Sequence, residues 1–599
     1  MSDDVATDAE INKELNTVLP KSYRDLIEEA YVLPIRSVLI VDDDFPTLEA
    51  FLHDAESKKP QEIERLKRLI AQCRCETAQW LVDVHDGSET NLQGKAGNLA
   101  HLHQSDLLIL DYHLDGDERN EKAIEIIRQI AASEYFNLIV VYTKGYGGHA
   151  GDLTQVGYEI AQSLSGIREN LEETLGIAPT SLEEWEDDDP DIEAKLSSSV
   201  DMPSLIKAVN SEKYDWNHWK LIPEMGMLRT TIEERQREKR ANMRETAEWI
   251  IKKKILQYKN KFPNNHYGDV NFSVQQDCVW VRADRVFLAV IGKQTQPEEI
   301  RNRLLDSLVN WNPSPHRLLM AKLRAELDTY GVGAESTVLA RKYIQAGWMR
   351  QLLEAKGIER PWRIRDAAAK HLEEMSGALH ANIQRFASAL CDAAVGQKSA
   401  DEVIHQYTGI NLLDEQQEKQ VKLQLNRYVC SKEVEGHHLM PGHILEIAAA
   451  QKTEYWLCLS PACDLVPGQS QRWGDQRSHQ IMPFKAVLLH TIPPLDALKI
   501  ATSNEMIFVE ILGKLAAFKF VDGAGSNPRW EQMFASNNGI IEENWKIDIA
   551  RLAIADGKIV PFNASVKVVA QLRYEYALNL LQRLGNSLSR VGLDFVKHE

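Results

Sequence analysis

Acidic and hydroxyl side chains follow three apolar runs in the first quarter of the chain. Asp42–Asp44 follow SVLIV, Asp111 follows LLIL, and Thr143 follows NLIVVY. Clustered carboxylates repel one another unless they share a cation, and Mg²⁺ is commonly held by one or two carboxylates with water and phosphate oxygens. A carboxylate can also attack phosphorus and form an aspartyl phosphate. These residue types therefore indicate phosphoryl chemistry that uses a divalent cation.

Each residue type suggests a separate role. Asp111 would be the nucleophile, while Asp43, helped by Asp42, would hold the Mg²⁺ that offsets the developing charge. The Thr143 hydroxyl could donate a hydrogen bond to a phosphoryl oxygen. Because that bond would exist only after phosphorylation, it could shift a neighbouring loop. The simplest alternative treats the successive acids as an N-cap and first-turn acids of a helix.

The elements that must hold these residues are short apolar runs that alternate with amphipathic stretches. Such strands, separated by helices, are typical of a parallel sheet covered on both faces. Ligands of these sheets bind beyond the carboxyl ends of the strands, which is where the acids and the threonine are expected. The four runs are 37–44, 80–84, 106–111 and 137–145.

Together these motifs resemble the receiver domain of two-component response regulators. The similar segments are VDDD, LLILDYHLDG and LIVVYTKG. The resemblance implies a flavodoxin-like, doubly wound parallel sheet, with Asp111 as phosphoacceptor and Asp42 and Asp43 as the acid pair that binds Mg²⁺. It also implies that the backbone carbonyl of His113 completes the metal shell and that Thr143 is the switch residue. A partner histidine kinase would supply the phosphoryl group.

The sequence departs from the receiver pattern at the fifth strand, which should carry a Lys-Pro whose lysine pairs with the phosphoryl group. We expect Lys220, in WNHWKLIP, to take this role, with Lys144 as its rival because it directly follows Thr143. If neither lysine reaches the site, the domain would be a pseudo-receiver scaffold without phosphoryl chemistry. The stretch between Asp43 and Asp111 is also longer than is usual in the family.

The 599 residues predict a multidomain α/β and α+β protein with a helical middle and a β-rich C-terminal domain. We expect the following parts in chain order: an N-terminal helix (1–35), a receiver with a solvated acidic loop inserted around 146–213 (36–223), a basic linker helix (224–262), a small α/β segment (263–313), a helical region (314–430), a β-rich barrel or sandwich (431–566) and a C-terminal helix (567–599).

Composition narrows the function of the remaining chain. A formal charge of −19 disfavours nucleic-acid binding by the whole surface. The acidic start and the lack of a long apolar run predict a cytoplasmic protein that does not enter a membrane. Seven thinly spread cysteines favour reduced thiols. No recognised catalytic output motif is present, and Cys463 and Asp464 are the candidates for a hidden enzymatic effector in 263–599 that the receiver would gate.

Two wider roles stay open at this stage, a signalling switch and a phosphoryl buffer. Long divergent receivers joined to unrecognised regions resemble components of bacterial anti-phage two-component operons of the Detocs kind, in which one receiver protein lacks an effector. That resemblance implies a second receiver protein with an effector as a further partner. A homodimer could form through helices at 229–261 or 572–591, because apolar residues recur along one face of each.

Overall fold

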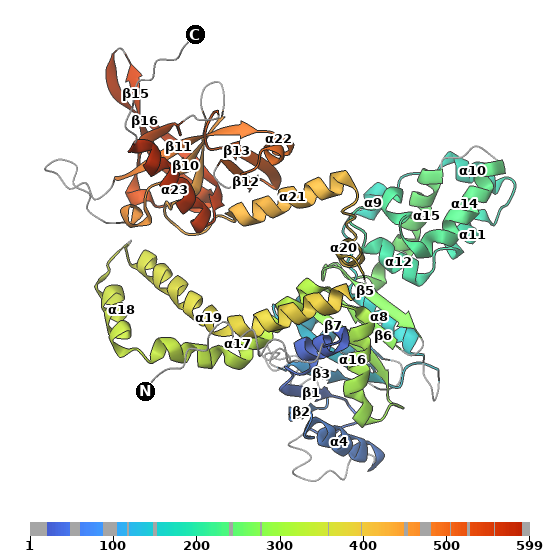
Figure 1. The fold of residues 1–599 in the computed structure, drawn as a ribbon. Coiled ribbons are helices and arrows are strands. Elements are labelled where there is room, and N and C mark those ends of the chain that lie inside the picture. Colours follow the sequence, from blue (N-terminus) through green and yellow to red (C-terminus); the bar gives the residue numbers. More distant parts are fainter. Residues whose placement is uncertain are drawn as a thin grey trace. The chain divides into compact units, whose positions relative to one another are not determined.

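The computed structural model divides the chain into two compact units (Figure 1). Unit 1 comprises Met1–Thr329 and Ile383–Ala394, and unit 2 comprises Tyr330–Asn382 and Val395–Glu599. The structure describes residues 21–47, 60–87, 105–114, 116, 119–147, 152–238, 243–275, 278–357, 359–396, 398–448, 453–467, 481–502, 505–523, 527–555 and 557–589.

Unit 1 is built on a seven-stranded sheet in the order β2-β1-β3-β4-β7-β6-β5. The first five strands are parallel, and their order is that of doubly wound, flavodoxin-like sheets. The last two strands extend the sheet in antiparallel pairing. The strands are β1 (Ser37–Val41), β2 (Leu81–His85), β3 (Leu107–Leu110), β4 (Asn137–Thr143), β5 (Asn271–Gln275), β6 (Cys278–Arg282) and β7 (Val286–Gly292).

Helices cover both faces of this sheet because its central strands are apolar on both sides. Every residue of β3 and β4 is buried, as is typical of strands that lie between two helical layers. One face packs against α7 (Glu121–Ala132) and α8 (Leu153–Leu164). The other packs against α4 (Pro60–Cys73) and α16 (Ile300–Trp311). Successive residues of each strand therefore reach opposite cores.

The expected N-terminal helix over 1–35 is described only from residue 21 onward, and residues 1–20 lie outside the described part. Ser22 caps α2 (Tyr23–Ile27), which continues as one π-helical turn (Glu28–Val32). The buried side chains of both segments join the core on the α4 side of the sheet.

The acidic stretch is helical and packed, which corrects the prediction of a solvated loop. Leu182, Trp185 and Ile192 are each 2% exposed or less and share one core with the sheet. They recur at intervals that place them on the inner side of their helices, so the acids face solvent. The helices here are α9 (Leu171–Thr174), α10 (Thr180–Glu186), α11 (Ile192–Ser198), α12 (Met202–Val209) and α13 (Trp216–Trp219).

The basic segment is not a free linker helix. It forms α14 (Gly226–Glu238) and α15 (Met243–Gln257). Ala247, Ile250 and Ile255 are at most 1% exposed, in the same core as the acidic helices. The apolar face that was expected to form a homodimer through 229–261 is therefore already covered inside unit 1.

The receiver sheet does not end at residue 223, where its boundary was predicted. Its fifth parallel strand is β7, which lies within the range assigned to a separate small α/β segment. Residues 144–285 separate β4 from β7 in the chain. This long stretch, which is helical as far as β5, hid the continuity of the sheet from local sequence patterns.

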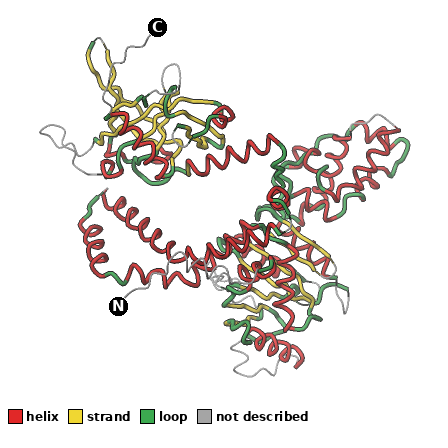
Figure 2. The backbone as a smooth tube through the Cα atoms, viewed as in Figure 1, coloured by secondary structure: helices red, strands yellow, loops and turns green. Residues whose placement is uncertain are grey.

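After α16 the chain is first helical and then rich in strands, drawn red and yellow in Figure 2. The start of α17 (Pro315–Leu339) and residues 383–394 of α19 (Glu359–Val395) belong to unit 1. The remaining helices of this region are α18 (Lys342–Glu354), α20 (Ala400–Thr408) and α21 (Glu415–Cys430).

The strands of unit 2 form a closed six-stranded barrel, which resolves the expectation of a barrel or a sandwich. The order is β10-β9-β16-β15-β14-β11, and pairing of β10 with β11 closes the ring. β13 and β12 extend it from β11. The strands are β8 (Ser431–Lys432), β9 (His443–Ala448), β10 (Thr453–Cys458), β11 (Met482–Ile492), β12 (Met506–Ile511), β13 (Lys514–Lys519), β14 (Trp530–Ala535), β15 (Lys546–Ala555) and β16 (Lys558–Leu572), and α22 is Pro494–Lys499.

The C-terminal helix α23 (Tyr574–Leu588) packs against strands of the barrel. Ala577, Leu580 and Leu584 are at most 1% exposed. Much of the apolar face of the segment 572–591, which was expected to pair with a second copy, is therefore covered within unit 2, although Leu588 is 46% exposed.

Candidate phosphoacceptor site

Three carboxylates meet at the carboxyl-terminal edge of the parallel sheet. One oxygen each of Asp42, Asp43 and Asp111 lies within 4.8 Å of the others. Asp42 and Asp111 are buried, while Asp43 is half-buried. Backbone bonds to neighbouring strands position the first and the last, from Asp42 N to His85 O (3.1 Å) and from Asp111 N to Val41 O (2.8 Å). The sheet itself therefore forces these acids together.

The lysine that enters this cluster is Lys293, which directly follows β7. Its Nζ lies 2.8 Å from Asp42 Oδ2 and 2.8 Å from Asp111 Oδ2, and its side chain is 3% exposed. Its backbone N–H donates to Thr143 O at 2.7 Å, which fixes it beside the end of β4. Three carboxylates and one ammonium group leave the buried cluster with a net negative charge.

The expected lysine, Lys220, does not lie in this cluster. It follows α13 in the insertion, and its Nζ donates to Asn217 Oδ1 at 3.3 Å. The rival, Lys144, lies near the acids, but its half-exposed Nζ faces Asp44 Oδ2 at 3.4 Å. One sequence signal could have identified Lys293: the run VFLAVIG is apolar on both faces, as in a central parallel strand, and ends immediately before this lysine.

Burial sets the electrostatics of the acids. Burial raises the pKa of Asp42 to about 7, with the attraction of Lys293 opposing and the repulsion of Asp111 adding to the shift. Burial, followed by repulsion from Asp111, also raises the pKa of Asp43. Burial lowers the pKa of Lys293, but the attraction of the carboxylates is larger, and its pKa is raised overall. Without a bound cation, keeping these buried carboxylates ionised costs free energy.

The donor set fits Mg²⁺. Carboxylate oxygens are the ligands this hard cation prefers, and a divalent charge would relieve the repulsion that raises the pKa of the acids. Within the described ranges, this is the one cluster of at least three acidic, histidine or cysteine side chains close enough to share a metal ion. The backbone N–H of His113 lies 3.4 Å from Asp111 Oδ1. The role of the His113 carbonyl as a ligand stays a prediction.

Thr143 is fully buried at the end of β4, with its hydroxyl engaged beside the acids. Its Oγ1 lies 3.3 Å from His113 Nδ1 and accepts a hydrogen bond from Gly145 N at 3.2 Å. The His113 ring meets Tyr112 and Tyr146 edge-on, with 5.2 Å between ring centroids in each pair. A phosphoryl group on the neighbouring aspartate would offer the threonine a charged acceptor, which forms the stronger hydrogen bond.

A carboxylate on α8, absent from the sequence-based expectations, joins the loop after β3 to the loop after β4. Glu159 Oε2 accepts hydrogen bonds from Tyr112 Oη, Tyr146 Oη and Asn120 Nδ2, each at 2.8 Å. Burial, followed by the charge of Glu159, raises the pKa of Tyr112. The loops after β3 and β4 are thereby anchored to the first helix of the insertion. No local spacing could reveal this, because the partners come from separate elements.

Comparison with known proteins agrees with this geometry. Residues 34–192 match the family model of the response receiver domain. This match identifies a response receiver domain within residues 34–192. The matched range contains Asp42, Asp111 and Thr143 but ends well before Lys293. Searches of curated proteins and of solved structures gave no match.

The candidates in unit 2 lie on a short 3₁₀ turn (Ala462–Leu465) that follows β10. Cys463 is exposed, and its Sγ lies 3.5 Å from Asp464 Oδ1. His443 is fully buried in the barrel, and burial lowers its pKa to about 3. An enzymatic role for Cys463 and Asp464 stays a prediction.

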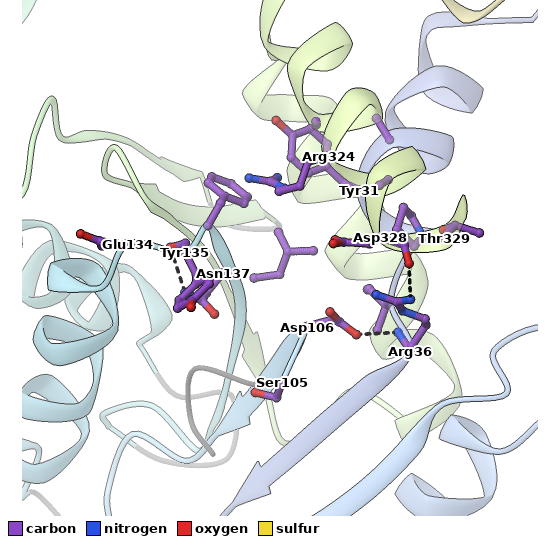
Figure 3. A pocket seen from close by; sticks show the side chains of 17 residues that line it. Tyr31, Arg36, Ser105, Asp106, Glu134, Tyr135, Asn137, Arg324, Asp328 and Thr329 are labelled. Carbon is purple, nitrogen blue, oxygen red and sulfur yellow. Dashed lines mark hydrogen bonds between the residues drawn. The ribbon is translucent and has the colours of Figure 1, made fainter. Parts of the chain in front are cut away.

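A cavity of about 220 Å³ lies at the opposite, amino-terminal edge of the sheet (Figure 3). Asp106 Oδ2 accepts the backbone N–H of Arg36 at 2.8 Å, and Arg36 Nη1 donates to Asp328 O at 3.1 Å. Arg36 and Asp106 directly precede β1 and β3, whose other ends carry the acids, so this cavity is not the phosphoacceptor site. Among the described residues, every helix is too short or too polar to span a lipid bilayer.

Proposed function

We propose that unit 1 accepts a phosphoryl group on Asp111 from a partner histidine kinase, with Mg²⁺ held by Asp42, Asp43 and Asp111. One observation carries the proposal: Lys293 Nζ lies 2.8 Å from Asp111 Oδ2 inside a three-carboxylate cluster at the carboxyl edge of a parallel sheet. This is where doubly wound sheets bind ligands.

The reaction is a phosphoryl transfer. A carboxylate oxygen of Asp111 attacks phosphorus while the bond from phosphorus to the kinase histidine nitrogen breaks, which leaves an acyl phosphate on Asp111 and a free imidazole on the kinase. Bound Mg²⁺ supplies positive charge next to the phosphoryl oxygens. Lys293 contributes a second positive charge, and because it is held by β7 it needs little reorganisation. Thr143 donates its hydroxyl hydrogen to a phosphoryl oxygen of the product.

We further propose that the acyl phosphate acts as a switch through Thr143 and His113. If the Thr143 hydroxyl turns to the phosphoryl oxygen, His113 Nδ1 loses this partner, and the ring lies between two tyrosines that Glu159 holds. The change would thus reach α8. A phosphoryl buffer in an anti-phage operon of the Detocs kind, in the bacterial cytoplasm, is the more specific role. It rests on the resemblance of a long divergent receiver joined to unrecognised regions.

Intact-mass measurement tests the phosphoacceptor. The wild-type chain is incubated with Mg²⁺ and acetyl phosphate, beside Asp111→Asn, Lys293→Met and Lys220→Met. We expect the mass of one phosphoryl group to be added to the wild type and to Lys220→Met, and not to Asp111→Asn. Lys293→Met should be labelled much less than Lys220→Met, which removes an equal charge outside the cluster.

Absence of labelling in every variant, also with histidine kinases as donors, would contradict the proposal and favour a pseudo-receiver scaffold.

A separate experiment addresses a gated effector in unit 2. If an effector uses these residues, the variant with Cys463→Ala and Asp464→Ala should lose the toxicity that the wild-type chain shows on expression. If the chain is a switch or a buffer, the variant and the wild type should affect cell growth equally.

A further inference from the structure

The loop of residues 293–296 follows β7 and carries Lys293 at its start. The ammonium group of this lysine lies 2.8 Å from an oxygen of Asp42 and 2.8 Å from an oxygen of Asp111. Its direction depends on the backbone of the loop, because the allowed rotamers of a side chain depend on its own φ and ψ. The next residue is Gln294, which, unlike proline, leaves its φ angle free. Contacts from outside the loop must therefore fix its backbone.

Tyr142 supplies such a contact from β4. It directly precedes Thr143, the last residue of that strand, and is 2% exposed. Its hydroxyl donates a hydrogen bond to Thr295 O at 2.8 Å and lies 3.4 Å from Lys293 O. One buried hydroxyl therefore lies against the backbone on both sides of Gln294.

The parallel pairing of β4 with β7 explains why Tyr142 reaches this loop. Tyr142 lies opposite Ile291, and Thr143 lies opposite Gly292. Lys293 is the next residue of the chain, and its N–H donates to Thr143 O at 2.7 Å. Its carbonyl faces the hydroxyl of Tyr142. Both polar groups of the Lys293 backbone thus lie next to two successive residues of β4.

The hydroxyl of Tyr142 is not needed for packing. The ring lies in the apolar core on the side of α4 and α16, where a phenyl ring would fill the same space. Burial raises the pKa of Tyr142, so the phenol keeps its proton and can donate it. An ion pair of Arg68 Nη2 with Glu298 Oε2, at 2.7 Å, joins α4 to the turn after the loop, but both side chains are exposed, and such pairs stabilise little. The buried bond of Tyr142 is therefore the stronger constraint on the loop.

We propose that Tyr142 is a positioning residue for phosphoryl transfer to Asp111. Its hydroxyl fixes the loop 293–296, so the ammonium group of Lys293 is already in place when the phosphoryl group arrives. A charge that is held in position needs no reorganisation during the reaction, and a displacement of about 1 Å lowers the rate strongly. The inference rests on the proposed function, because Tyr142 acts on the phosphoryl group only through Lys293.

Initial rates of labelling test this role in the full chain with Mg²⁺ and acetyl phosphate, followed by intact mass. We expect Tyr142→Phe to be labelled about fivefold more slowly than the wild type, the factor that corresponds to one hydrogen bond of about 1 kcal/mol. In the Lys293→Met background, the same change should slow labelling by less than about twofold, since the residue that Tyr142 positions is gone. A residue that only stabilises the fold would slow labelling equally in both backgrounds.

Tyr214→Phe is the matched control. Tyr214 is also a buried tyrosine of unit 1, and its hydroxyl donates to a backbone carbonyl, Val209 O, at 2.7 Å. It lies in the insertion and touches neither the acids nor the loop 293–296. We expect this variant to be labelled at the wild-type rate.

Two results would overturn the positioning role: an undiminished rate for Tyr142→Phe, or the same slowing with and without Lys293→Met. If the wild type is not labelled at all, the proposed function fails, and urea unfolding of the same variants decides on the positioning of Lys293. Tyr142→Phe should then raise the unfolding equilibrium constant of unit 1 about fivefold in the wild-type background and less than about twofold with Lys293→Met. Equal factors in both backgrounds would mean that Tyr142 does not position Lys293.

Discussion

The buried carboxyl group of Asp42 should make unit 1 less stable as the pH rises. Burial raises its pKa to about 7 in the folded chain, from an ordinary value of 3.8. Between these two pH values the folded chain holds a proton that the unfolded chain has lost, so the free energy of unfolding falls as pH increases through this window. At pH 5, two units below the folded pKa, the proton contributes about 3 kcal/mol that is absent at pH 8.

Urea unfolding at pH 5 and pH 8, in the presence of a chelator, measures this contribution. We compare the wild type with Asp42→Asn, which cannot titrate but keeps an oxygen to accept the backbone N–H of Asp44, a bond of 3.0 Å in the wild type. Asp306→Asn, at an exposed carboxylate, is the control. From pH 5 to pH 8, the free energy of unfolding of the wild type should fall by about 3 kcal/mol more than that of Asp42→Asn. Equal pH dependence in both would refute the reasoning.

Magnesium provides a second arm of the same experiment. The cation binds the ionised carboxylate, so binding at pH 5 must first displace the proton of Asp42. Addition of Mg²⁺ should therefore raise the unfolding midpoint of unit 1 strongly at pH 8 and weakly at pH 5. The unfolding of unit 2 gives an internal reference, because the cluster lies in unit 1.

Three further changes separate the roles of the residues around the acids. Lys293→Met should lower the free energy of unfolding by about 3 kcal/mol at pH 8 in denaturant titrations, because it leaves buried carboxylates without their ammonium partner, while Lys220→Met should change it by less than about 0.5 kcal/mol. Thr143→Val should still be phosphorylated, but phosphorylation should no longer change amide hydrogen exchange in α8. If phosphorylation changes exchange in α8 of this variant as much as in the wild type, the switch is refuted. Tyr112→Phe should cost about 1 kcal/mol in urea unfolding, since Glu159 loses one donor, and no loss would mean that this bond contributes nothing to stability.

Residues at the ends of the early strands could be predicted, because the argument there is local. A buried apolar strand followed by an acid predicts a site residue wherever strands run parallel, and the structure brings Asp42, Asp43 and Asp111 together as this argument requires. Lys293 follows the same rule. The prediction missed Lys293 because the fifth strand was expected directly after the acidic stretch. No local sequence pattern shows that residues 144–285 separate two neighbouring strands of one sheet.

The sequence analysis missed two other features, for different reasons. Charge density alone suggested a solvated loop around Trp185, but a few apolar side chains at helical spacing are enough to bury one face and leave the acids outside. The bonds of Glu159 to Tyr112 and Tyr146 join separate elements, so they follow from the packing of α8 against the sheet and from no motif.

The late arrival of β7 has a consequence for synthesis of the chain. A ribosome adds about 5–20 residues per second, so the 142 residues between β4 and β7 take on the order of ten seconds to make. During that time the nascent sheet has β4 as an open edge, and Asp42 and Asp111 lie beside each other before Lys293 exists. Folding of the inserted helices during this interval would shield that edge, and a proton or a cation would have to hold the acids together. The sheet of unit 1 is thus completed by β7, the strand of this sheet that the ribosome makes last, which joins β4 to β6 and β5.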